Sequence, residues 1–84
     1  MSENDLDGTV RGILGEFGKL SADPSAISET QDLYALGLAS HATVNVVMAI
    51  EDELDIEFPD ELLTKSTFTT LQSLKDAIRP LVAA

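Results

Sequence analysis

Apolar residues near the start of the chain recur at helical spacing and predict a first amphipathic helix. They fall mostly three or four positions apart, and they are Leu6, Val10, Ile13, Leu14, Phe17 and Leu20. Residues at this spacing share one face of a helix, where they can pack against a core. The same segment contains several glycines, each of which costs about 1 kcal/mol relative to alanine in a helix interior. Tertiary packing therefore has to hold this helix together.

A second helix is predicted to start just after Ser40 and to end near Leu54 or Asp55. Ser40 is a good N-cap, because a serine hydroxyl can accept a hydrogen bond from a backbone N–H of the first turn. At about 100° per residue, one narrow stripe of this helix is expected to face the core. The members of the stripe are Thr43, Val46, Val47, Ile50 and Leu54.

A second apolar line follows the same predicted helix and consists of His41, Val44 and Met48. Val44 and Met48 lie roughly 100–140° from the centre of the core stripe. The residues alone leave two interpretations open. Either the helix is buried on two sides, or the line is exposed beside the acids Glu51 and Asp52 and contacts a partner protein.

A long connection over residues 21–39 joins the two predicted helices. It contains the turn-forming residues Pro24 and Gly37. Loops of this length are uncommon in small domains and tend to be functional or linkers. Apolar residues are spaced through the connection and are expected to pin it to the core: Ile27, Leu33, Leu36 and Leu38.

The remaining sequence predicts one short and one longer helix. Proline at position 59 ends the second helix, since it pushes the preceding residue away from the helical region, and residues 59–63 suit a short helical turn. A capping-box pattern at residues 69–72 precedes the last helix, which Pro80 is expected to stop. The apolar face of this last helix consists of Leu71, Leu74 and Ile78.

Length and composition place these helices in one domain. A chain of 84 residues has no room for a second core, so we expect a single domain over residues 1–84. The hydrophobic content of 44% is that of a globular protein and not of a disordered chain. The expected fold is all-α, a four-helix bundle with three longer helices, one short helix and a long loop between helices 1 and 2.

Several kinds of site are excluded by the residue types that the chain lacks. Without cysteine there is no disulfide, thiolate zinc site or cysteine nucleophile, and one histidine cannot make a histidine-rich metal site. No apolar stretch approaches the roughly 20 residues that span a bilayer, and the acidic start lacks a signal-peptide core. We therefore expect a cytoplasmic protein without a bound metal ion.

The charge of the chain is strongly acidic, with 15 acids against 5 bases and a net charge of −10. No basic residue lies between Lys19 and Lys65. The electrostatic field of so many negative charges repels nucleic acids and anionic membranes and attracts basic protein surfaces. The acidic surface is either a solubilising face or a docking surface for partners with Arg/Lys patches.

No arrangement of residues predicts catalysis. Ser40 and His41 are adjacent, so their side chains diverge at the start of a helix and do not form a nucleophile–base pair. The acidic run at residues 51–57 lacks the twelve-residue calcium loop with its central glycine. We therefore expect no catalytic residues and no enzymatic activity.

Two segments frame the second predicted helix: residues 32–40 read DLYALGLAS, and residues 51–60 read EDELDIEFPD. They resemble the acyl carrier protein family, in which a Leu-Gly-x-Asp-Ser-Leu motif opens this helix and acids with an Ile/Phe-Pro-Asp/Glu turn close it. The resemblance covers nearly the whole chain and implies an acyl-carrier-like four-helix bundle. It also implies that Ser40 carries a 4′-phosphopantetheine arm donated by coenzyme A.

The same resemblance implies a set of partners. These are a phosphopantetheinyl transferase, a ligase that loads an acyl or aminoacyl group, and downstream transferases with basic docking patches. The residues that it implies for partner binding are His41, Val44, Met48, Glu51 and Asp52. We expect a monomer that binds neither nucleic acid nor membranes.

The chain departs from the family pattern at the start of the second helix. Ala39 stands where the family has Asp, His41 where it has Leu, and Ala42 and Asn45 where acids are usual. In related carriers the missing Asp helps to hold the magnesium that the transferase uses. A fatty-acid synthase partner that contacts these front acids is therefore expected to bind poorly.

The departures make the chain similar to atypical stand-alone carriers. Some of these are loaded with amino acids by ligases that resemble truncated aminoacyl-tRNA synthetases, and others serve specialised lipid or secondary-metabolite pathways. The leading hypothesis is therefore a carrier of acyl or aminoacyl thioesters. The alternative is a non-enzymatic acidic helical module that binds a basic protein, with Ser40 only an N-cap.

Overall fold

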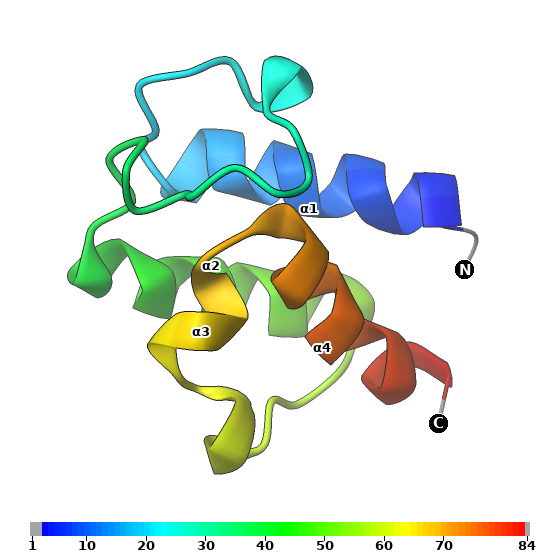
Figure 1. Cartoon of the computed structure of the whole chain (residues 1–84). Coiled ribbons are helices and arrows are strands. Elements are labelled where there is room, and N and C mark those ends of the chain that lie inside the picture. The colour runs from blue at the N-terminus through cyan, green and yellow to red at the C-terminus, as the bar shows by residue number, and fades with distance from the viewer. Residues whose placement is uncertain (1–2, 84) are drawn as a thin grey trace.

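Helices and short turns build the part of the chain that the computed structural model describes, residues 3–83 (Figure 1). The long helices are α1 (Glu3–Phe17), α2 (Ser40–Leu54) and α4 (Leu71–Ala83). The short elements are the 3-10 turns η1 (Pro24–Ala26) and η2 (Asp60–Leu62) and the four-residue helix α3 (Lys65–Phe68). No strand occurs within residues 3–83. The prediction of an all-α, four-helix fold with three longer helices and one short helix is confirmed. The short turn predicted at residues 59–63 is η2, and the pattern did not predict the position of α3.

Burial on α1 and α4 follows the predicted spacing. The buried apolar residues of these two helices are Leu6, Val10, Ile13, Leu14, Leu71, Leu74 and Ile78. Phe17 is only half-buried, and Leu20 lies beyond the last residue of α1. Burying one such leucine or isoleucine stabilises the fold by about 1.5–3 kcal/mol, so packing against α2 and α4 outweighs the cost of the glycines in α1.

On α2 the buried face of the helix is rotated slightly from the predicted one. Its buried residues are Ala42, Val46 and Ile50. The predicted members Thr43, Val47 and Leu54 are half-buried. Val44 and Met48 are 58% and 61% exposed, and His41 is exposed as well. The second apolar line therefore faces outward, which decides between the two interpretations left open by the sequence.

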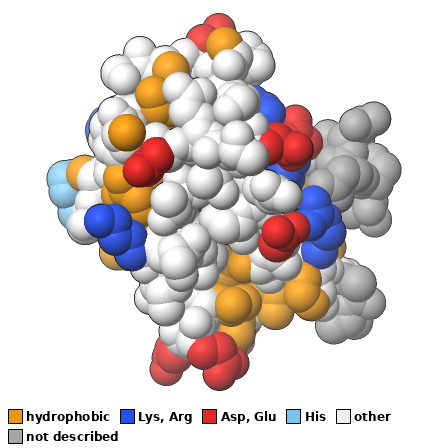
Figure 2. Space-filling model, viewed as in Figure 1, with side chains coloured by type: hydrophobic (Ala, Val, Ile, Leu, Met, Phe, Trp, Pro, Cys, Tyr) orange, Lys and Arg blue, Asp and Glu red, His pale blue; other side chains and the backbone are white. Residues whose placement is uncertain are grey.

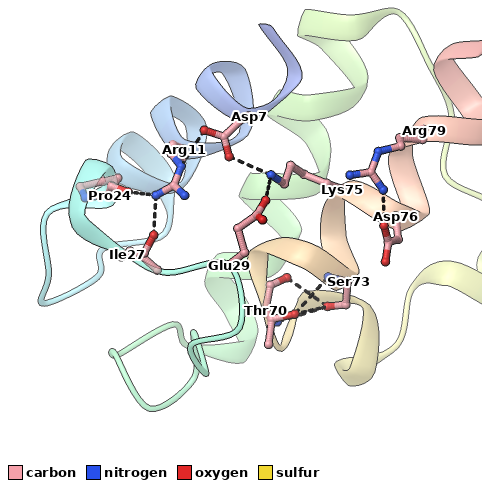
Figure 3. A network of polar contacts seen from close by, with 10 residues as sticks. All are labelled: Asp7, Arg11, Pro24, Ile27, Glu29, Thr70, Ser73, Lys75, Asp76 and Arg79. Atoms are coloured by element: carbon pink, nitrogen blue, oxygen red, sulfur yellow. Dashed lines mark hydrogen bonds and ion pairs between the residues drawn. The ribbon is translucent and has the colours of Figure 1, made fainter. Parts of the chain in front are cut away.

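The long loop is held against the helices, as predicted. Ile27, Leu33 and Leu38 are buried in the core, and Leu36 is half-buried against it. The Leu33 N–H donates a hydrogen bond of 2.7 Å to the Thr69 carbonyl. Arg11 of α1 donates from Nη1 to the carbonyls of Pro24 at 2.7 Å and Ile27 at 2.6 Å (Figure 3). These contacts fix the path of the chain from α1 to the start of α2.

Lys75 is buried within the apolar face of α4, where only 2% of the residue is exposed. Its Nζ donates to Oδ1 of Asp7 at 2.9 Å and to Oε1 of Glu29, so one ammonium group joins α1, the loop and α4 (Figure 3). Burial alone would lower the pKa of Lys75, but the hydrogen bonds to Glu29 and Asp7 outweigh it and raise that pKa. The apolar spacing of this helix did not predict these contacts.

The two ends of α4 differ from the prediction. The capping box lies one residue later than residues 69–72: Oγ1 of Thr70 accepts from the Ser73 N–H at 3.0 Å, and Oγ of Ser73 accepts from the Thr70 N–H at 3.2 Å. Pro80 does not stop the helix, which continues to Ala83. A proline so close to the end removes little of the hydrogen-bond ladder, because few residues follow it. Within residues 3–83, no helix is both long enough and apolar enough to cross a membrane.

Candidate functional site

Ser40 is the first residue of α2, and Ala39 is its N-cap. The Ala39 backbone is extended, with φ −86° and ψ 151°, and its carbonyl accepts from the Ala42 N–H at 2.9 Å. The predicted N-cap role of Ser40 is therefore wrong: the helix begins one residue earlier, and the capping position carries a methyl group. The Ser40 side chain is exposed, and its hydroxyl forms no hydrogen bond within the described part of the chain.

The turn before Ser40 is set by Gly37 and Leu38. Gly37 has φ +106°, which side-chain-bearing residues rarely adopt. Its N–H donates to the Tyr34 carbonyl at 3.1 Å, and the Leu38 N–H donates to the Leu33 carbonyl at 3.1 Å. Leu38 is 3% exposed and anchors the chain in the core two residues before Ser40. The serine is thus presented at the surface from a fixed turn.

The electrostatic surroundings of Ser40 favour an anion. The first turn of α2 contains no acidic residue, and no side chain caps its backbone N–H groups. The N-terminus of a helix carries a partial positive charge and unpaired amide donors. An anionic ester on the Ser40 hydroxyl would therefore be accommodated without repulsion from the helix itself.

A groove of about 380 Å³ opens beside Ser40, between α2 and the segment that contains η2 and α3. Its lining residues are Tyr34, Ser40, Thr43, Val44, Val47, Met48, Leu63, Thr64, Lys65 and Phe68. Lys65 is the charged member of this lining, and its Nζ lies 5.2 Å from the centroid of the Tyr34 ring. Burial, and to a lesser degree the carboxylate of Asp32, raises the pKa of Tyr34 above its ordinary value of 10.0.

The residues expected to bind partners lie along α2, but they differ in how accessible they are to a partner. Val44 and Met48 are exposed on the rim of the groove. Asp52 is exposed, whereas Glu51 is half-buried and its Oε2 accepts from the Phe58 N–H at 2.8 Å. Glu51 thus holds the chain after α2 in place, and Asp52 is the more accessible of the two acids.

A second hollow of about 510 Å³ lies where the middle of α2 meets the end of α1. It is lined by Phe17, Asn45, Met48, Ala49, Glu51 and Asp52. Met48 therefore contributes to both hollows, and it lies between the groove beside Ser40 and the acids at the end of α2. A partner that binds over either hollow would therefore contact Met48.

Sequence reasoning missed Tyr34 and Lys65. No local pattern connects them, because Tyr34 belongs to the long loop and Lys65 begins α3. For the described residues, no group of three or more His, Asp or Glu side chains is placed to hold a metal ion.

A family model described as "Phosphopantetheine attachment site" matches residues 8–78. The chain belongs to this family. It is accordingly a carrier protein, and the group that it carries is 4′-phosphopantetheine. The resemblance noted from the two segments around α2 is confirmed.

Two curated relatives cover most of the chain. An aminoacyl carrier protein of Agrobacterium fabrum is 39% identical over 74 residues, which are 88% of this chain and 89% of the relative. An acyl carrier protein of Akkermansia muciniphila is 40% identical over 83 residues, which are 93% of this chain and 90% of the relative. Both kinds of carrier are therefore among its relatives.

Solved structures of ligase complexes contain chains of the same fold. One is an engineered Bradyrhizobium japonicum glycine:[carrier protein] ligase complexed with a carrier protein from Agrobacterium tumefaciens and ATP. The match has a TM-score of 0.84 and 39% identity, and it covers 89% of this chain and 97% of the other. In the B. japonicum ligase with its cognate carrier protein, the match has a TM-score of 0.69 and 27% identity over 92% and 95% of the two chains.

The residues around Ser40 fit the family's prosthetic group. The group is attached through a phosphodiester, which needs an accessible hydroxyl and an environment that tolerates a negative charge. The exposed, unbonded Ser40 hydroxyl at the acid-free start of α2 offers both.

Proposed function

We propose that this carrier protein holds an acyl or aminoacyl group as a thioester on 4′-phosphopantetheine attached to Ser40, and delivers that group to partner enzymes. The observation that carries the proposal is the exposed Ser40 hydroxyl at the start of α2, which has no hydrogen-bond partner among the described residues. In the attachment step, Oγ of Ser40 loses its proton and forms a bond to the coenzyme A phosphorus that carries the pantetheine. The pyrophosphate P–O bond breaks, and adenosine 3′,5′-bisphosphate leaves. When bound, the group supplies a terminal thiol that holds the cargo.

The protein's own contribution is presentation and recognition rather than catalysis. Ser40 and His41 are both exposed, and no hydrogen bond joins their side chains in the described structure. Chemistry at the thioester therefore belongs to the partner enzymes, for which Val44, Met48 and Asp52 provide an apolar and acidic surface on α2. A partner with basic residues would be attracted to this surface.

We infer that the cargo is an amino acid loaded by a ligase. This choice is supported by the relative named as an aminoacyl carrier protein and by the fold shared with carriers complexed with glycine ligases. The acid-free first turn of α2 supports it as well, because a partner that needs acids there would find none.

The attachment is tested by incubating the purified protein with coenzyme A and a promiscuous phosphopantetheinyl transferase, followed by intact-mass measurement. The expected result is a gain of one phosphopantetheine group in the wild-type protein and none in Ser40→Ala. The matched control is Ser28→Ala, which removes another exposed serine hydroxyl and should still be loaded. Loading of Ser40→Ala, or no loading of the wild-type protein by several transferases, would contradict the proposal.

A further inference from the structure

Lys65 is an unusual cation for this molecule. It is the only basic residue between Lys19 and Lys75 in a chain whose net charge is −10. It is exposed, begins α3 and forms no ion pair with a carboxylate among residues 3–83. Its ammonium group lies over the ring of Tyr34. An acidic protein thus keeps a cation without a carboxylate partner on the groove that also receives Ser40.

We propose that Lys65 and Tyr34 form the binding site for the first part of the prosthetic arm, with the Lys65 ammonium group paired to the phosphodiester on Ser40. The inference rests on the proposed attachment at Ser40. The arm would then lie along the groove between α2 and α3, against the Tyr34 ring, instead of extending freely into solvent.

The positions of the three residues support this pairing. Ser40 enters the groove from α2, Lys65 from the start of α3 and Tyr34 from the loop. The flexible stem of a lysine lets its ammonium group follow an anion on the opposite rim, and a hydrogen bond between two charged groups is stronger than one between neutral groups. Figure 2 shows hydrophobic side chains gathered at one edge of the molecule, next to a basic side chain and the histidine.

Charge complementarity selects the phosphodiester over other occupants of the groove. The lining is otherwise apolar or hydroxyl-bearing, so Lys65 is its only full charge. A phosphodiester on Ser40 would be the nearest new anion, and it would be attached to the groove and so present at high effective concentration. Contact with the Tyr34 ring keeps the ammonium group over the groove until the anion is present.

The test uses the full chain, loaded in vitro and shown by intact mass to carry one phosphopantetheine group. Nuclear Overhauser cross-peaks between the methyl groups of the arm and the Tyr34 ring protons are compared in wild-type protein, Lys65→Gln, Lys65→Arg and Lys19→Gln. Lys19→Gln removes the same charge from another exposed lysine, which does not line the groove.

The cross-peaks are expected in wild-type protein, Lys65→Arg and Lys19→Gln, and to be at least fivefold weaker in Lys65→Gln. About 1 M salt should weaken them in wild-type protein too, because the Debye length falls to about 3 Å. Equal cross-peaks in Lys65→Gln, or none in fully loaded wild-type protein, would overturn the inference. Failure of the proposed attachment would be visible earlier and separately, as the absence of the mass gain on Ser40.

Discussion

Ala39 occupies the N-cap position of α2 with a side chain that cannot cap. Its backbone has the extended geometry of an N-cap, but a methyl group accepts no hydrogen bond. The N–H groups of Ser40 and His41, for which the described residues provide no acceptor, therefore stay available to an anion on Ser40. A capping side chain at this position would compete for the same donors. The start of α2, where the prosthetic group is proposed to attach, is therefore less stable in the apo-protein than a capped helix start would be.

Ala39→Ser is expected to increase the free energy of unfolding of the apo-protein by about 1 kcal/mol, since it supplies the missing N-cap hydroxyl. Urea denaturation at neutral pH measures the change. Ala35→Ser is the matched control, because Ala35 is exposed and lies outside α2, and it should change stability by less than about 0.5 kcal/mol. An Ala39→Ser variant no more stable than this control would contradict the assignment of Ala39 as the N-cap.

Along α2, packing and recognition lie on different faces of the helix. The buried line of Ala42, Val46 and Ile50 holds α2 in the core, whereas Val44 and Met48 are exposed beside the acids. A substitution on the exposed face can therefore alter partner binding without altering the fold. This separation makes the proposed docking surface testable by mutation.

Met48→Glu is expected to change the free energy of unfolding by less than about 0.5 kcal/mol, because Met48 is 61% exposed. It should reduce loading by a partner aminoacyl ligase about tenfold, since it removes an apolar contact and adds a charge at the interface. Chemical denaturation and a loading assay on the holo-protein measure the two effects. The contrasting variant Ile50→Ala, in the core, should cost about 2–5 kcal/mol. Unchanged loading of Met48→Glu would remove Met48 from the docking surface.

The elements themselves were largely predictable, and their ends were not. Apolar spacing located the three long helices, because one face of each has to be buried whatever its neighbours are. The caps were each misplaced by one residue, at Ser40 instead of Ala39 and at Thr69 instead of Thr70. The N-cap is the residue whose carbonyl accepts the first hydrogen bond of the helix. The residue types near a helix start constrain the position of that residue only loosely.

The candidate site was predictable only where a local sequence pattern marks it. Helical spacing placed Val44 and Met48 away from the core, and the motif singled out Ser40. The burial of Lys75 could be inferred from its position, since it lies at helical spacing between buried Leu71 and Ile78. Its partners on α1 and the loop, and the meeting of Tyr34 with Lys65, depend on tertiary packing that no local pattern contains.

At the scale of the whole molecule, Arg11 and Lys75 join separate elements of an acidic chain. Arg11 and Lys75 both contact Asp7, at 2.8 Å and 2.9 Å (Figure 3), and Arg79 pairs with Asp76. The hydrogen bond from Lys75 is the largest cause that lowers the pKa of Asp7 below its ordinary value of 3.8, and Arg11 adds to it against the opposing effect of burial. Asp7 thus contacts both cations that bind the loop, Arg11 at its carbonyls and Lys75 at Glu29.

The stability of the fold is expected to depend on the ionisation of Asp7. Because its pKa is lowered in the folded state, the carboxylate contributes its full stabilisation above pH 3.8, and that contribution is lost as the pH falls through the folded-state pKa. Asp7→Asn should be about 1–2 kcal/mol less stable than wild type at pH 7. Its free energy of unfolding should fall less steeply between about pH 5 and pH 2, so that the two curves approach each other in acid.

Urea denaturation across this pH range measures both curves. Asp60→Asn is the charge-matched control, because Asp60 is exposed in η2 and outside the Lys75 network, and its curve should stay close to that of wild type. If the Asp7→Asn curve were instead displaced by a constant amount at every pH, Asp7 would act through packing or neutral hydrogen bonds alone. The loop before Ser40 would then not be held by its charge.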